Sequence, residues 1–214
     1  DDNSNDDNEY YQNNDNLKSF ILSQAKLDKY ELKSVLHLIS KISKNHHRDI
    51  TFLDKIKQLI SIFQTEIKQT LSNYDIYNIF KKNKIILLYL IEEKIITIDP
   101  EIIKKMTQNE DQNYKEYFKP EIQQNYQSKE MPESFIEKRR KGENDSYICE
   151  IIRNDNVVEF IVLYNQNEIS LTMEIPTSIY ETNSFLIKNK PTLIEYSAFF
   201  GSIQIFNYLR MNGI

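Results

Sequence analysis

The sequence has 214 residues, 40% of them hydrophobic, and a net charge of -5, which suffices for one sizeable hydrophobic core or two small ones. Its three glycines, Gly142, Gly201 and Gly213, are too scattered to build a phosphate-binding glycine loop, which argues against a nucleotide-binding α/β enzyme. The single cysteine, Cys149, excludes an internal disulfide and a cysteine-rich zinc site.

Charge and hydropathy also bear on partners and location. The longest apolar run, residues 85–91, is far shorter than the roughly 20 residues of a bilayer span. No signal-peptide pattern is visible at the start of the sequence. The acidic balance argues against a basic face for nucleic acid. We therefore expect a cytoplasmic protein, with a nuclear location as the alternative, and no cofactor, metal, nucleic-acid or membrane partner.

The first 70 residues divide into two parts. Residues 1–16 carry acidic and amide side chains without Lys or Arg, which predicts a disordered acidic tail. From Leu17 the apolar residues recur at three- and four-residue spacing, which predicts a helical hairpin or bundle over 17–70.

The middle of the chain predicts short helices. Residues 73–80 and 84–93 read as an antiparallel pair joined by a tight link. Asp99 and Pro100 favour the start of a helix that runs through Met106. The polar segment 108–131 predicts a long, partly irregular connection, and Pro132 then opens a helix through Arg140 that Gly142 closes.

The last third predicts two more helix pairs. The first pair is 146–153 with 156–163, and the second is 193–200 with 203–211. A long loop with one short helical turn, 164–189, separates them. Thr192 and Glu195 form a capping box at the start of the last pair.

The segment 192–213 resembles an ankyrin repeat. The matching positions are Thr192, Ile194, Ser197, Ala198, Gly201, Leu209 and Gly213. Leu193 and Glu195 depart from the proline and histidine of the repeat. A degraded copy around Asp155, which aligns with Gly201, lies 46 residues earlier, against an ankyrin period of roughly 33 residues.

Over roughly residues 17–214 the chain is also similar to an uncharacterised helical domain that precedes the ankyrin repeats of protist ankyrin-repeat proteins. The strings that carry this resemblance are 73–80, 142–149, 181–188 and 192–209. The resemblance implies an all-α fold, with irregular ankyrin-like helix pairs stacked as a short α-solenoid over 71–214, and no particular reaction. It also implies downstream ankyrin repeats, so we expect the sequence to be a piece of a longer chain.

These features predict a non-enzymatic scaffold or adaptor module that binds a protein partner. The candidate partner-binding residues are Lys188, Asn189, Phe199 and Phe200; the two aromatics stand where ankyrin repeats place variable contact residues. Two alternatives stay open: a structural cap of a longer ankyrin array, and an enzyme of unrecognised type.

Other motifs carry less weight. The histidines, His37, His46 and His47, lack the convergent partners of a metal site. Cys149 has no histidine near it in sequence that could activate it as a nucleophile. The basic run 138–141 is typical of a solvated helix end rather than a phosphate-binding patch.

Overall fold

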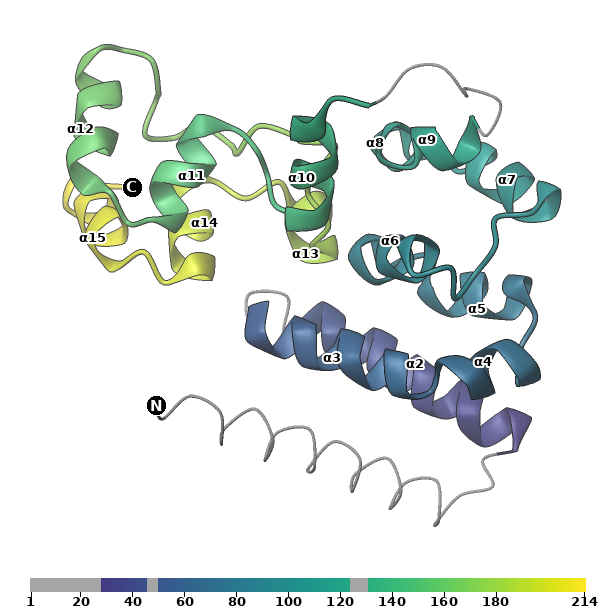
Figure 1. The fold of residues 1–214 in the computed structure, drawn as a ribbon. Helices are drawn as coiled ribbons and strands as arrows, with labels where there is room; N and C mark the ends of the chain where they lie inside the picture. The colour runs from purple at the N-terminus through teal and green to yellow at the C-terminus, as the bar shows by residue number, and fades with distance from the viewer. Residues whose placement is uncertain (1–27, 46–49, 124–130) are drawn as a thin grey trace, which may run out of the picture.

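The fold was analysed in a computed structural model that describes residues 28–45, 50–123 and 131–214 (Figure 1). Over these residues the chain forms 14 helices, α2 to α15, and no strand beyond an isolated bridge between Glu174 and Thr192. The predicted all-α class is confirmed. The predicted acidic tail, residues 1–16, lies outside the described residues.

The helices form two groups in Figure 1. The first group is α2 (Lys29–Asn45), α3 (Ile50–Ile62), α4 (Gln64–Thr70), α5 (Asn73–Phe80), α6 (Lys84–Glu92), α7 (Pro100–Thr107), α8 (Gln112–Tyr117) and α9 (Lys119–Ile122). The second group is α10 (Glu133–Lys141), α11 (Tyr147–Arg153), α12 (Val157–Asn165), α13 (Ser184–Asn189), α14 (Leu193–Phe200) and α15 (Ile203–Met211).

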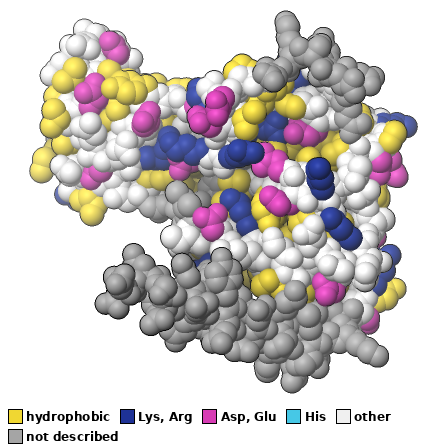
Figure 2. All heavy atoms as spheres, in the orientation of Figure 1, with side chains coloured by type: hydrophobic (Ala, Val, Ile, Leu, Met, Phe, Trp, Pro, Cys, Tyr) yellow, Lys and Arg dark blue, Asp and Glu magenta, His cyan; other side chains and the backbone are white. Residues whose placement is uncertain are grey.

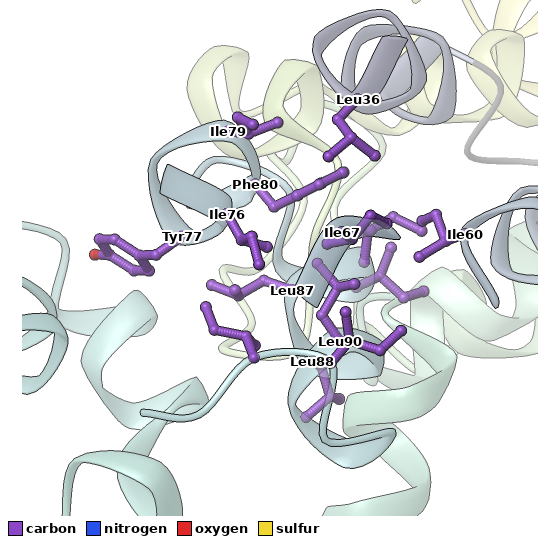
Figure 3. Close-up of a cluster of buried hydrophobic side chains, with 14 of the residues drawn as sticks. Leu36, Ile60, Ile67, Ile76, Tyr77, Ile79, Phe80, Leu87, Leu88 and Leu90 are labelled. Carbon is purple, nitrogen blue, oxygen red and sulfur yellow. The ribbon is translucent and has the colours of Figure 1, made fainter. Parts of the chain in front are cut away.

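One continuous hydrophobic cluster holds α2 to α9 together. Figure 3 shows Leu36 of α2, Ile60 of α3 and Phe80 of α5 within it, and these three side chains are almost completely buried. Burying a side chain of this size stabilises the fold by roughly 1.5–3 kcal/mol. The cluster contains Ile67 and Ile76 alike, so it extends across residue 70. The predicted division of domains at that residue stays a prediction.

A second hydrophobic cluster lies within α11 to α15. The helix α11 packs against α12 and α14, and α15 packs against α14 and α12. Two short helix pairs, α11–α12 and α14–α15, therefore lie side by side, with first helix against first helix and second against second.

Three of the helix pairs, α5–α6, α11–α12 and α14–α15, share a backbone frame. In each pair a polar N-cap residue starts the second helix, and a residue with positive φ follows eleven positions later. The N-cap residues are Asn83, Asn156 and Ser202, and the positive-φ residues are Lys94, Asn167 and Gly213. The last two pairs also share a positive φ after the first helix, at Asp155 (49°) and Gly201 (71°). These two residues are the ones that the sequence comparison aligned, 46 residues apart.

Direct hydrogen bonds join the two stacked pairs. The hydroxyl of Ser202 donates to the carbonyl oxygen of Ile152. The carboxylate of Asp155 accepts from the N–H groups of Gln204 and Ile205, both at 3.0 Å. The link of the first pair thus caps the second helix of the next pair, satisfying N–H groups that a helix start leaves without partners.

A polar junction connects the two groups of helices. Gly142 ends α10 in the left-handed conformation, and its carbonyl oxygen accepts from the N–H of Thr182 at 3.1 Å and from its hydroxyl at 2.8 Å. The buried ammonium of Lys84 donates to the carbonyl oxygen of Glu181 at 3.1 Å. Segments 97 residues apart therefore meet at this junction.

Most predicted helices begin and end where expected, and α5, α14 and α15 match to the residue. The predicted connection 108–131 differs, because α8 and α9 form inside it and bury Tyr114, Tyr117 and Phe118. The ring centroid of Phe118 lies 4.8 Å from those of both tyrosines. This aromatic packing outweighs the polar composition that suggested an irregular segment.

Candidate functional site

Phe199 and Phe200, the two aromatics predicted to bind a partner, end α14 and are half-buried. The ring of Phe199 stacks on Phe185 of α13, with centroids 5.8 Å apart and planes inclined by 8°. Phe200 packs against Tyr196 at 4.6 Å. We call Phe185, Tyr196, Phe199 and Phe200 the aromatic cluster. It covers part of the second hydrophobic core and leaves the Phe185 side chain 54% exposed.

The loop before α14 folds back and positions α13. The N–H of Ile175 donates to the carbonyl oxygen of Pro191 at 2.8 Å, which ties the middle of the loop to its end. Asn183 caps α13 by accepting from the N–H of Phe185 at 2.9 Å, and Lys190 ends the helix with a φ of 45°. This turn places Phe185 against α14.

Lys188 and Asn189, the other two candidate residues, are exposed at the end of α13. The side-chain amide of Asn189 donates to the carbonyl oxygen of Phe185 at 2.9 Å. Lys188 and Asn189 follow Phe185 by three and four positions, so the three residues share one side of α13. Phe185 therefore lies on the same side of α13 as Lys188 and Asn189 and stacks on Phe199 of α14.

Sequence analysis did not select Phe185, although a signal was present. Phe185 and Leu186 are adjacent large apolar residues on a six-residue helix, and neighbours on a helix point in different directions. Leu186 is buried in the core, which leaves Phe185 at the surface.

The start of α14 lies where the sequence predicted it. Thr192 and Glu195 form the capping box, and the Glu195 carboxylate accepts from the Thr192 N–H at 2.8 Å and from its hydroxyl at 2.9 Å. The bond from the backbone N–H lowers the pKa of Glu195. Ser197, in the middle of the helix, is completely buried and donates to the carbonyl oxygen of Leu193.

A pocket of about 140 Å³ lies beside α13. Its walls include Glu181, Leu186, Lys190 and Tyr196. Burial raises the pKa of Glu181, and its carboxylate accepts from the N–H of Asn183 at 2.7 Å. The Glu181 carboxylate is thus held by the protein's own backbone.

Arg153 lies close to the same pocket, where it pairs with a carboxylate and donates hydrogen bonds to two neighbouring oxygen atoms. Its guanidinium pairs with Glu143 at 3.1 Å and donates to the carbonyl oxygen of Asn144 and to the hydroxyl of Tyr196, at 2.9 and 3.0 Å. Burial raises the pKa of the Tyr196 hydroxyl. These polar groups bond to one another, which gives them a structural role.

The remaining chemical candidates do not converge. Cys149 is fully buried, and this burial raises the pKa of its thiol, which disfavours the nucleophilic thiolate. His37 is exposed on α2, whereas His46 and His47 lie outside the described residues. Among residues 28–45, 50–123 and 131–214, no three His, Cys, Asp or Glu side chains form a group that could hold a metal ion.

All four residues of the basic run 138–141 take part in ion pairs. Lys138 pairs with Asp145 at 2.9 Å and Arg140 with Glu92 at 3.1 Å. Arg139 departs from the predicted solvated helix end, because it is buried and pairs with Glu121 at 2.7 Å.

Comparisons with known proteins found no match for this chain among family models, curated proteins or solved structures. None of the helices in the described part of the chain has both the length and the apolar character needed to cross a bilayer.

Proposed function

We propose that this chain is a non-enzymatic scaffold or adaptor module, and that its partner binds the aromatic cluster together with Lys188 and Asn189. The observation that carries the proposal is the pairing of Phe185 with Phe199. This pair joins α13 to α14 and exposes a large aromatic surface beside a lysine. Aromatic side chains that are partly held by their neighbours are typical anchors of protein interfaces.

We also propose that α11 to α15 form a divergent ankyrin-like stack. Support comes from the side-by-side packing of the two helix pairs and from their shared backbone frame. Repeat proteins stack such pairs so that each covers the apolar face of the next. The 46-residue separation exceeds the ankyrin period of roughly 33 residues because the long loop 166–183 precedes α13.

The test compares two variants that each remove one exposed aromatic ring. Phe185→Ser alters the aromatic cluster, and Tyr30→Ser alters α2, where the side chain is 81% exposed. A partner captured from source-cell lysate by the intact chain should be lost with Phe185→Ser and retained with Tyr30→Ser. Circular dichroism checks that both variants fold.

Retention of the partner by both variants would contradict the proposed surface. Capture of no specific partner by the intact chain would contradict the adaptor function itself.

An alternative function, a structural cap of a longer ankyrin array, draws on a different observation. The second helices of the two stacked pairs carry exposed apolar residues: Val158 (71%), Ile203 (68%) and Met211 (82%). Figure 2 shows hydrophobic side chains gathered on the lobe that contains α12 and α15. If this chain is a cap, fusing consensus ankyrin repeats after Ile214 should give one cooperative melting transition at a raised temperature. Two independent transitions would contradict it.

A further inference from the structure

A second hollow in the surface lies between α5 and α7, far in sequence from the aromatic cluster. Its volume is about 260 Å³, just below the roughly 300–1,000 Å³ that small-molecule sites usually span. It is lined by Tyr74, Tyr77, Asn78, Lys81, Lys82, Lys105 and Asn109. We call this hollow the lysine pocket.

The packing of α7 against α5 brings the lysines together. Lys81 is the C-cap of α5, Lys82 lies in the link to α6, and Lys105 lies on α7, which packs against α5. A fourth lysine, Lys44 at the end of α2, is close enough to Lys82 for their charges to interact. Lys81 and Lys82 are therefore neighbours in the sequence, and the fold brings Lys105 to them.

Among the residues that the structure describes, no acidic side chain lines the lysine pocket. Asp75, the carboxylate next to Tyr74 in sequence, is already bonded to Lys33 at 2.7 Å. Within residues 28–45, 50–123 and 131–214, Lys81, Lys82 and Lys105 form no ion pair with a carboxylate. A positive charge thus accumulates locally on a chain whose net charge is -5.

Burial, together with the charge of Lys82, lowers the pKa of Lys44. A bound anion would relieve the repulsion between the lysines, and lysine ammonium groups are common ligands of phosphate.

The pocket also offers neutral groups that suit such a ligand. Asn78 holds the ammonium of Lys81 through a bond of 3.0 Å to its side-chain oxygen, and Asn109 adds a second amide. Figure 3 shows the ring of Tyr77 turned away from Phe80 and the centre of the core. Tyr77 lines the pocket while remaining buried, so an aromatic ring contributes to its wall.

We propose that the lysine pocket binds a small phosphorylated ligand, either a free solute or the phosphorylated headgroup of a lipid. Size argues for a small ligand over a nucleic acid, since the lysines surround one hollow and do not form a row. The net charge of the chain also favours a small ligand, because a chain with excess acidic residues repels an extended polyanion at long range. A ligand inside the pocket interacts mainly with the nearby lysines, because the Debye length is only about 8 Å at physiological salt.

The experiment titrates the full chain with sodium tripolyphosphate by calorimetry at physiological salt. Lys81→Gln/Lys82→Gln/Lys105→Gln removes three charges from the pocket. The matched control, Lys55→Gln/Lys68→Gln/Arg210→Gln, removes three charges from exposed residues elsewhere. The intact chain and the control should bind, and the Kd of the pocket variant should rise at least about tenfold, since charge-assisted bonds are lost.

All six replaced residues are exposed, and a melting curve checks that each variant folds. Should the triple variant fail to fold, the single change Lys105→Gln should still raise the Kd. Equal binding by the intact chain and a folded pocket variant would overturn the proposal, as would no binding by the intact chain at millimolar tripolyphosphate.

Two further arms identify the source of the phosphate. Binding to vesicles that contain phosphatidylinositol bisphosphate, lost in the pocket variant, would assign the pocket to a lipid headgroup. Tripolyphosphate binding without vesicle binding would assign it to a free solute. A single-stranded RNA that binds through these lysines when tripolyphosphate does not would overturn the proposed small ligand.

Discussion

At the residue scale, Gly142 is a central part of the polar junction, where its carbonyl oxygen accepts two hydrogen bonds from Thr182. Its φ is +69°, a conformation that costs a residue with a side chain about 1–2 kcal/mol. A Cβ atom at this position would lie 2.9 Å from the Cδ1 of Ile85 and 2.9 Å from the Oγ1 of Thr182. We predict that Gly142→Ala lowers the free energy of unfolding by about 2–4 kcal/mol, because overpacking adds to the backbone strain. Urea denaturation measures this loss.

Gly213→Ala is the control for that prediction. Gly213 has a comparable φ of +83°, but its Cβ would meet no atom within 4 Å. Its replacement should therefore cost only the backbone term, about 1–2 kcal/mol. Equal losses for the two variants would show that the junction yields around a new methyl group.

At the scale of elements, the contact between the two stacked helix pairs depends on Ser202. Its buried hydroxyl donates to the carbonyl oxygen of Ile152 in the preceding pair. We predict that Ser202→Ala lowers the free energy of unfolding by about 1–2 kcal/mol, since the carbonyl oxygen loses a buried partner. Thermal or urea unfolding detects the change.

Ser146 supplies a matched comparison. It precedes α11 as Ser202 precedes α15, and neither hydroxyl caps its own helix. In the described part of the chain, the hydroxyl of Ser146 has no nitrogen or oxygen partner, and its polar neighbour is the thiol of Cys149. Ser146→Ala should therefore change the stability by less than about 0.5 kcal/mol. A loss as large as that of Ser202→Ala would mean that the bond to Ile152 is not the cause.

Helices that start with a cap could be predicted, because a cap joins residues close together in the sequence. The caps Asp99 and Thr192 bond to groups three residues away, so sequence spacing alone located the starts of α7 and α14. In contrast, α8 and α9 are held by aromatic packing and by the bond from the Tyr117 hydroxyl to the carbonyl oxygen of Arg139. That hydrogen bond joins residues 22 positions apart, so no periodic pattern within one segment of the sequence predicts it.

Long-range contacts limited the prediction of the candidate sites in the same way. Phe199 and Phe200 could be selected by their place at the end of a recognisable helix. The stacking of Phe185 on Phe199 and the lysine pocket could not be predicted, because they depend on how the loop before α14 returns and how α7 packs on α5. No spacing within one segment encodes either arrangement.

At the scale of the whole molecule, the ion pairs at the junction differ in how deeply they are buried. The side chains of Arg139 and Glu121 are only 6% and 14% exposed, whereas Arg140 is 63% exposed. We predict that Arg139→Gln lowers the free energy of unfolding by about 3–5 kcal/mol, because Glu121 would keep a buried charge without its partner. Arg140→Gln, the matched control, should cost no more than about 1 kcal/mol.

Chemical denaturation of the two variants under identical conditions provides the measurement. Similar losses would indicate that water reaches Glu121, so that the junction is looser than its geometry implies.

The bond between Lys84 and Glu181 also has a consequence for the order of events during synthesis. Among the described residues, the buried members of the hydrophobic cluster of α2 to α9 lie between Leu32 and Phe118, so this core can close while the rest of the chain is still being translated. The partner of Lys84 is made 97 residues later. Until Glu181 has been made, the Lys84 ammonium cannot form this bond and stays hydrated at the edge of the first hydrophobic cluster. The loss of water from Lys84 therefore accompanies the docking of the second group of helices and can serve as a marker for it.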